Sequence, residues 1–249
     1  MYYYKKTIKS GYLTEIEYIK SLKPRNKKNV ARGKNICKTK EQQQKANKIR
    51  AIKNTQRLIC CNFSAGDYFV RFSAPSETFT ESEFRKEVNK FINRVKYHAK
   101  KNGFEVKYIG FIECGVRGKN WHLHIILSAE IVKIAREQWK WKNGINLQPL
   151  YEDGQFFKLA EYIRKDIQGS KRLMTSRNLT KPEVKVVKCG KRRFSKLEKG
   201  EIVDVPEKGY TLVSDYCPLD DSWACSYSFT FFNSSIFYEK ERKENYGTS

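Results

Sequence analysis

The sequence of 249 residues contains no run of eighteen apolar residues, so no segment is expected to span a membrane. Its first residues lack the apolar core and the small-residue cleavage site of a signal peptide, which favours a protein that stays in the cytoplasm. None of the seven cysteines belongs to a C-x-x-C pair, and this absence argues against a zinc ribbon. The glycine-rich loop G-x-x-x-x-G-K-[ST] is also missing, so no helicase domain is expected.

Acidic residues are scarce relative to basic ones, and the imbalance is local. Fifty Lys and Arg against 27 Asp and Glu give a net charge of +23. Residues 1–57 hold 17 basic and 3 acidic residues, and residues 169–196 hold 10 and 1, whereas residues 198–249 hold 5 and 10. Phosphate backbones are the natural partners of such basic clusters, although a solubility device or a ribosome-associated tail remains open. Charge alone does not separate DNA from RNA.

Composition divides the chain into three parts. Residues 1–57 look like a basic N-terminal arm, whose run from Lys20 is either disordered or a helix that forms on DNA. Residues 58–169 alternate between strand and helix patterns and are predicted to form the catalytic domain. Residues 170–249 are predicted to be a basic and then β-rich C-terminal extension.

The order of elements predicts an α+β fold. Residues 58–73 are predicted to form strand, turn and strand, and Thr80 with Glu83 fits a capping box for a helix over 80–101. The remaining predicted strands and helices follow the same periodicities: strands at 104–115, 121–128, 145–151, 183–188, 210–214 and 226–233, and helices at 130–141 and 155–168. We expect an antiparallel sheet with helices on one face, which leaves the other face free for a site.

Histidine is also rare, and two of the three histidines lie one residue apart. His122 and His124 occur in the predicted strand WHLHIIL at Trp121–Leu127. Because strand side chains alternate, both imidazoles are expected on the open face, where they could bind one cation. A purely structural pair is the alternative for a bare H-x-H motif.

Glu113 lies nine residues before His122, on the preceding predicted strand. If the two strands pair as a hairpin, its carboxylate approaches the imidazoles, and the three ligands suit Mg²⁺ or Mn²⁺. One difficulty is strand parity, since Glu113 shares its face with Ile109 and Phe111, which look buried. A bulge near Gly115 is one way to reorient the side chain.

The helix predicted at 155–168 brings three polar side chains to one face. Tyr162, Lys165 and Asp166 stand at i, i+3 and i+4. A tyrosine oxygen can attack a phosphodiester, and Lys165 could supply the cation that helps it. Asp166 could orient Lys165 or assist a metal ion. Tyr162 as plain core and Asp166 as a surface acid are the alternatives.

Together these residues resemble the HUH endonuclease superfamily, and more narrowly the rolling-circle replication initiators of small plasmids and single-stranded DNA phages. Leu58–Phe63 stands where the family's first apolar strand falls. The segment from Glu113 to His124 resembles the metal motif, and Tyr162 with Lys165 resembles the Tyr-x-x-Lys motif. The resemblance covers roughly residues 58–168, and it shows one tyrosine in the helix motif where some relatives have two.

The resemblance implies both a fold and an activity. The fold is an RRM-like, ferredoxin-type antiparallel sheet. The activity is metal-dependent nicking of single-stranded DNA at a replication origin through a 5′-phosphotyrosine, followed by rejoining of ends. A bacterial host would supply the helicase and the polymerase. Basic side chains of the second cluster are predicted to contact DNA, namely Arg172, Arg177, Lys191, Arg192 and Arg193.

Two other functions remain open. A transposase or relaxase of the same superfamily would share the chemistry, although a relaxase usually has three histidines and only His98 remains, on a predicted helix. A non-enzymatic RRM-like protein could stack bases on Tyr68, Phe69 and Phe72 and would need no metal.

Overall fold

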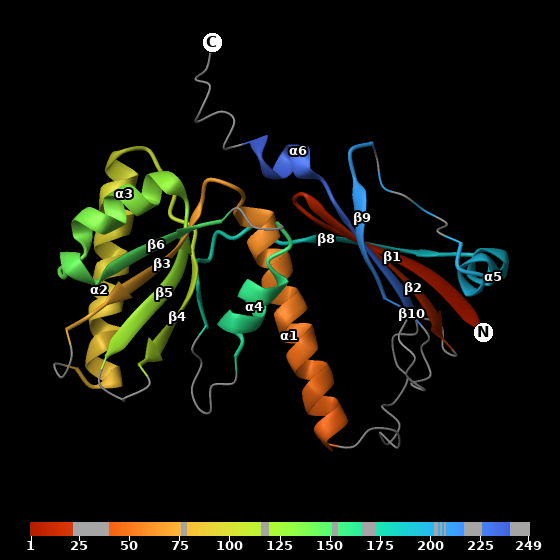
Figure 1. Ribbon diagram of the computed structural model, residues 1–249, viewed down its shortest axis with the longest axis horizontal. Helices are drawn as coiled ribbons and strands as arrows, with labels where there is room; N and C mark the ends of the chain where they lie inside the picture. Colours follow the sequence, from red (N-terminus) through yellow and green to blue (C-terminus); the bar gives the residue numbers. More distant parts are fainter. Residues whose placement is uncertain are drawn as a thin grey trace, which may run out of the picture.

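The computed structural model describes residues 1–21, 40–75, 79–115, 120–150, 154–165, 173–201, 204, 206, 208–216 and 226–239. These residues form two antiparallel five-stranded sheets and six α-helices, so the predicted α+β class is confirmed (Figure 1). No helix in the described ranges is both long and apolar enough to cross a membrane.

The first sheet has the strand order β6-β3-β5-β4-β7. Its strands are β3 (Tyr68–Ser73), β4 (Ile109–Cys114), β5 (Trp121–Leu127), β6 (Ile145–Pro149) and β7 (Leu173–Thr175). Among the described strands β6 lies at the edge, as Pro149 predicted, because proline cannot donate a hydrogen bond to a further strand.

Helices α2 (Glu81–Lys101) and α3 (Ala129–Gln138) cover one face of this sheet. The predicted capping box is present, with Thr80 Oγ1 accepting from the Glu83 amide and the Glu83 carboxylate accepting from the Thr80 amide. Alternate residues of the central strand, Leu123, Ile125 and Leu127, are buried in the core beneath these helices. A 3₁₀ turn, η1 (Lys142–Gly144), leads into β6.

The other face is covered at one end by two further helices, so helices do not lie on one face alone. Helix α1 (Lys40–Asn62) runs through the middle of the molecule, with α4 (Phe157–Ile163) beside it (Figure 1). A second core joins them to the sheet through Ile109, Phe111 and Ile126. The face predicted to be open is therefore accessible only beyond these buried side chains.

The strand predicted over Leu58–Phe63 is wrong, because residues up to Asn62 are the last turns of α1. The predicted boundary after residue 57 consequently falls inside a helix. Ile59 and Cys60 are buried between the first sheet and the N-terminal hairpin. A short apolar run such as LICC has no periodicity that separates a buried strand from a buried helix end.

The second sheet combines the two ends of the chain in the order β8-β1-β2-β10-β9. Its strands are β1 (Tyr2–Ser10), β2 (Leu13–Ser21), β8 (Glu183–Lys188), β9 (Thr211–Tyr216) and β10 (Ser226–Phe232). Helices α5 (Lys191–Glu198) and α6 (Ser234–Phe237) complete this part. The three strands predicted in the extension are confirmed.

Residues 2–21 are therefore an integral hairpin and not part of an appended arm. Tyr4, Ile8, Ile16 and Tyr18 are buried in it, and this apolar pattern was masked by the lysines between them. Residues 40–57 are helical, in agreement with one of the two forms predicted for the basic run, and residues 22–39 lie outside the described part.

The hairpin docks onto α1 through charge and through close backbone contact. Arg57 donates to both oxygens of Glu15, which is almost fully buried, and to Glu17 at 3.4 Å. At the hairpin turn Gly11 has φ +59°, and a Cβ there would collide with the carbonyl oxygen of Cys60. The turn thus needs glycine both for its backbone conformation and for the space beside α1.

Gly11→Ala is expected to lower the free energy of unfolding by about 2 kcal/mol or more, because it adds a backbone clash to left-handed strain. Gly103→Ala is the matched control, since Gly103 also has a left-handed φ (+76°) but no atom within 4 Å of the added Cβ. Urea unfolding of both variants measures the difference. Equal losses would contradict close docking of the turn on α1.

Candidate active site

The two histidines of β5 lie on the face opposite α2 and α3, as strand alternation predicts. Their rings face each other with centroids 6.2 Å apart and planes at 83°. Ile126 continues the same row of side chains and is buried in the second core. The end of the row that carries His122 and His124 extends beyond that core.

Glu113 lies directly opposite His122 in the β4–β5 ladder, so its side chain is on the same face as the two imidazoles. The parity difficulty disappears because Ile109 and Phe111 are buried against α1 and α4, on this face of the sheet. No bulge is needed. The sequence presented one buried face, whereas the structure has buried side chains on both.

His124 is held rigidly within the sheet. Its ring stacks on Phe111 at 4.9 Å and on Phe69 at 5.6 Å, and its Nε2 lies 3.3 Å from Glu113 Oε2. Burial lowers the pKa of His124 to about 4, although Glu113 opposes the shift. The imidazole is therefore neutral at pH 7. Its Nδ1 is buried and makes no hydrogen bond within the described residues.

His122 is oriented by a residue that the sequence analysis missed. Its Nδ1 lies 2.9 Å from the hydroxyl of Ser73, the residue paired with it across β3 and β5. Burial lowers the pKa of His122, as does the positive charge of Arg71. A partner on one ring nitrogen fixes the ring and directs the other nitrogen, which is how metal-binding histidines are commonly held.

Tyr162 meets the carboxylate from the opposite side. Its hydroxyl donates to Glu113 Oε2 at 3.1 Å, and its ring contacts Phe111 edge-on at 5.6 Å. Burial and the neighbouring Glu113 raise the pKa of Tyr162 to about 12, so the phenol keeps its proton at neutral pH. The side chain is still 36% exposed, which allows a substrate to reach its oxygen.

Helix α4 owes its position to α1. The Arg164 guanidinium, at the C-terminal end of α4, donates from Nε to Thr55 Oγ1 at 2.7 Å. The Gln56 amide donates to the carbonyl oxygen of Gln155, just before α4, also at 2.7 Å. These bonds hold both ends of α4 against α1, so α1 sets where Tyr162 lies.

The helix predicted over 155–168 is shorter than expected, because α4 ends at Ile163. Lys165 lies beyond this end and is exposed, so helical spacing no longer places it on the face of Tyr162. The short helix is held by tertiary contacts, and periodicity alone overestimates such a length. Asp166 lies outside the described residues.

Arg71 is a second residue that the sequence analysis did not single out. It lies on β3 directly opposite His124, between Phe69 and Ser73 on the same face. Its charge lowers the pKa values of both histidines and opposes the rise at Tyr162. The alternation of β3, with Val70 and Phe72 buried, was the signal that could have placed it in the site.

All four side chains at the centre of this site come from one stretch of chain, between Glu113 and Tyr162. Residues 71–168 match a protein family described as replication-associated protein, of the ORF2 type. The match supports a role in DNA replication, and we call these residues the replication-associated region. It begins at Arg71 in β3 and extends past the end of α4. No curated protein matches the chain.

The basic residues predicted to contact DNA do not gather at the site, and all of them lie beyond the replication-associated region. Lys191, Arg192 and Arg193 are exposed on α5, which lies at the far end of the second sheet from α4 (Figure 1). Arg193 also pairs with Asp204 at 3.5 Å. Arg177 is exposed after β7, and Arg172 is outside the described residues.

The aromatic side chains that a base-stacking protein would need are only partly available. Phe72 is fully buried under α2 and α3, and Tyr68 packs against the same core, so neither presents a free ring. Phe69 alone of the three lies on the face of the site, where it stacks on His124. The predicted stacking platform is therefore wrong for two of its three members.

The donor set of the replication-associated region fits a divalent cation by its chemistry. Two neutral imidazoles and one carboxylate share a face of two paired strands, and the buried Nδ1 of His124 is unsatisfied within the described residues. The described His, Cys, Asp and Glu side chains do not form a closed group of three around one point. Instead Glu113 bonds to His124 and Tyr162.

Proposed function

We propose that this protein is a replication initiator of the HUH type, which nicks single-stranded DNA with Tyr162 as the nucleophile. The observation that carries the proposal is the hydrogen bond from the Tyr162 hydroxyl to Glu113 Oε2, beside His124 and His122. A tyrosine packed as plain core would have no reason to point its oxygen at a carboxylate and two histidines. The match of residues 71–168 to a replication-associated family supports the same function.

The nicking step follows from this geometry. Tyr162 Oη forms a bond to the phosphorus while the bond from phosphorus to the 3′-oxygen of the preceding nucleotide breaks. Glu113 Oε2 accepts the hydrogen bond of the phenol, so the proton leaving Tyr162 has an acceptor in place. The departing 3′-oxygen takes a proton from water and becomes a hydroxyl.

His122, His124 and Glu113 are the residues that would hold a divalent cation, Mg²⁺ or Mn²⁺. When bound, such a cation polarises the phosphate and offsets the negative charge that otherwise keeps the proton on Tyr162. The chain supports binding by keeping both imidazoles unprotonated at neutral pH. Ser73 supports it by fixing the orientation of His122.

The phosphotyrosine conserves the energy of the broken bond, which makes the step reversible. A later 3′-hydroxyl can attack the phosphorus, restore a phosphodiester and return the proton to Tyr162. The free 3′-hydroxyl made by the first cut can prime a polymerase of the host, whose helicase would unwind the strand. These properties define rolling-circle replication at an origin.

Lys165 and Arg71 are the nearest basic side chains with a part to play. Lys165 is exposed just beyond α4, where it can contact the phosphate backbone. Arg71 faces His124 across the strand pair, and its positive charge opposes the effect of Glu113 on Tyr162. The more distant cations of α5 and Arg177 would attract DNA through long-range charge and so affect binding more than cleavage.

Ser73→Ala is expected to weaken Mn²⁺ binding about tenfold, because His122 loses the partner that orients its ring. Isothermal titration calorimetry with Mn²⁺ measures the change directly. Ser128→Ala is the matched control, since the Ser128 hydroxyl makes no capping bond to α3. An unchanged affinity in Ser73→Ala would contradict His122 as a ligand held by Ser73.

The function is tested by incubating the full chain with single-stranded fragments of its own replicon and Mn²⁺, with and without EDTA. A denaturing gel should show a shortened DNA strand and a protein–DNA adduct only where the cation is present. Binding without any adduct, across the whole replicon and with both Mn²⁺ and Mg²⁺, would leave a non-enzymatic nucleic-acid-binding protein as the better explanation.

A further inference from the structure

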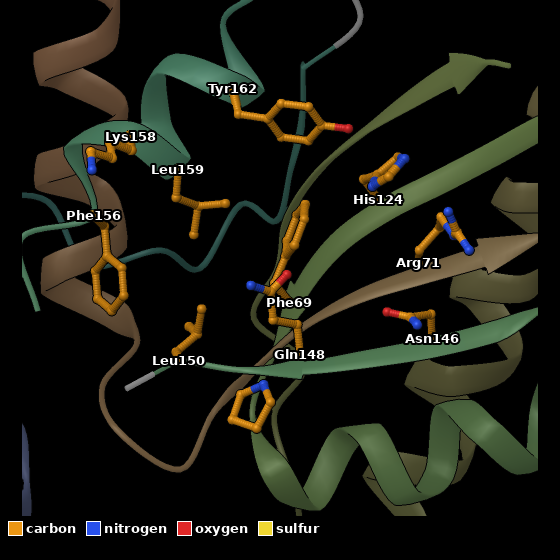
Figure 2. A pocket seen from close by; sticks show the side chains of 11 residues that line it. Phe69, Arg71, His124, Asn146, Gln148, Leu150, Phe156, Lys158, Leu159 and Tyr162 are labelled. Carbon is orange, nitrogen blue, oxygen red and sulfur yellow. The ribbon is translucent and has the colours of Figure 1, made fainter. Parts of the chain in front are cut away.

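A cavity of about 450 Å³ opens beside Tyr162, on the side away from Glu113 (Figure 2). Strands β3 and β6 form its floor, and α4 with the residues before it forms a wall. Tyr162 and His124 stand at its margin. A molecule in this cavity would therefore touch the same tyrosine whose oxygen is positioned for attack, and 450 Å³ is within the usual range for a bound small ligand.

The floor is polar and regular. In the β3–β6 ladder Phe69 lies opposite Gln148, and Arg71 lies opposite Asn146, so all four side chains emerge from one face. Asn146 and Gln148 are exposed. Within the described part of the chain neither amide group has a hydrogen-bond partner. Both amides are thus available to a ligand.

The wall is apolar. Leu150, Phe156 and Leu159 line it, and Figure 2 shows them grouped on the side of the cavity opposite Arg71 and Asn146. Phe156 has φ 54°, and no other described non-glycine residue has a positive φ. This left-handed conformation is unfavourable for phenylalanine, and it occurs where the ring completes the wall. Lys158 adds a positive charge at the same margin.

This combination is suited to an unstacked nucleobase. A base has two flat apolar faces, which the ring of Phe69 and the wall can contact, and a polar edge that carries donors and acceptors. An amide side chain offers donor and acceptor atoms in a plane and so can pair with such an edge. Arg71 and Lys158 are placed to contact the flanking phosphates.

We propose that this cavity binds the base of a nucleotide flanking the phosphate that Tyr162 attacks, and that Asn146 and Gln148 recognise its edge. The inference rests on the proposed function in that it takes single-stranded DNA as the ligand. It makes β6 the strand that determines the sequence of the nick site. Base recognition at this position then also aligns the phosphate with Tyr162.

The test compares base preferences with and without the two amides. The parent is full-length Tyr162→Phe, which prevents cleavage, and it is equilibrated with Mn²⁺ and a pool of randomised single-stranded DNA whose bound fraction is sequenced. We expect a preference of roughly tenfold or more for one base at one position. Asn146→Ala with Gln148→Ala should remove that preference and leave those at other positions.

Gln43→Ala with Asn47→Ala is the matched control, because this pair of amides bonds to each other on α1, away from the cavity. It should change no preference. Asn146→Asp, which keeps the size of the side chain, serves if the double alanine variant does not fold. It replaces the amide donor with an acceptor and should shift the preference toward a base with an exposed donor, such as cytosine.

A preference that survives the loss of both amides would overturn the proposal, and so would the absence of any positional preference in the parent. Adduct formation by the unmodified protein reports on the nicking function separately. Nicking without an amide-dependent preference would refute the cavity proposal alone. An amide-dependent preference without nicking would refute the proposed function alone.

Discussion

Tyr162→Phe is expected to abolish the covalent adduct and to reduce nicking by ~1,000-fold or more, because no other group replaces a missing nucleophile. Binding of single-stranded DNA should persist, since the variant removes only the oxygen that donates to Glu113. Denaturing gels with 5′- and 3′-labelled strands measure both cleavage and attachment, and attachment should follow the 5′ end. Fluorescence anisotropy measures binding on the same strands.

Tyr97→Phe is the matched control for this experiment. Tyr97 is an exposed tyrosine of α2, on the other side of the first sheet, and its loss of a hydroxyl should leave nicking unchanged. A normal adduct in Tyr162→Phe would remove Tyr162 from the role of nucleophile. Relaxases and transposases of the superfamily share this chemistry, so the DNA ends that are cut and joined distinguish them from a replication initiator.

Removal of the divalent cation is expected to have an effect of similar size. Treatment with EDTA should reduce nicking roughly 100-fold or more, since a bound cation contributes several kcal/mol to stabilising charge in phosphoryl transfer. His122→Ala should cause a comparable loss because it removes one of the three ligands. Excess Mn²⁺ should restore the EDTA-treated protein fully and the variant only in part.

His98→Ala is the control here, because His98 is the remaining histidine and lies near the end of α2, away from the strands of the site. Its nicking and its Mn²⁺ dependence should equal those of the unmodified protein. Full nicking in EDTA, or in His122→Ala, would show that the paired histidines are structural. A protein that only binds nucleic acid would show neither a cation requirement nor an adduct.

Local sequence patterns determined the parts of the site that depend on one or two neighbouring elements. Alternation along Trp121–Leu127 placed His122 and His124 on one face, and a short connection between β4 and β5 brought Glu113 opposite them. The capping box at Thr80 marked the start of α2 correctly. Such features follow from backbone geometry within a few residues, which the amino-acid sequence specifies directly.

Tertiary structure alone decided the rest. LICC at the end of α1 is apolar in either conformation, and its burial between a sheet and a distant hairpin made it helical. The basic N-terminal residues joined the C-terminal strands in one sheet, because their apolar side chains complete a core whose other half lies near the opposite end of the chain. The parity of Glu113 was resolved only once the face carrying Ile109 and Phe111 had its own helices.

Arg71, Ser73 and the cavity over Asn146 and Gln148 depend in the same way on strand order. They meet His122, His124 and Tyr162 because β3 lies between β5 and β6, although these strands are far apart in sequence. The sequence by itself determined which residues have the chemistry for cleavage. The packing of α4 against α1, and of three strands side by side, decided which of them meet, because contacts between distant segments depend on the whole core and not on local pattern.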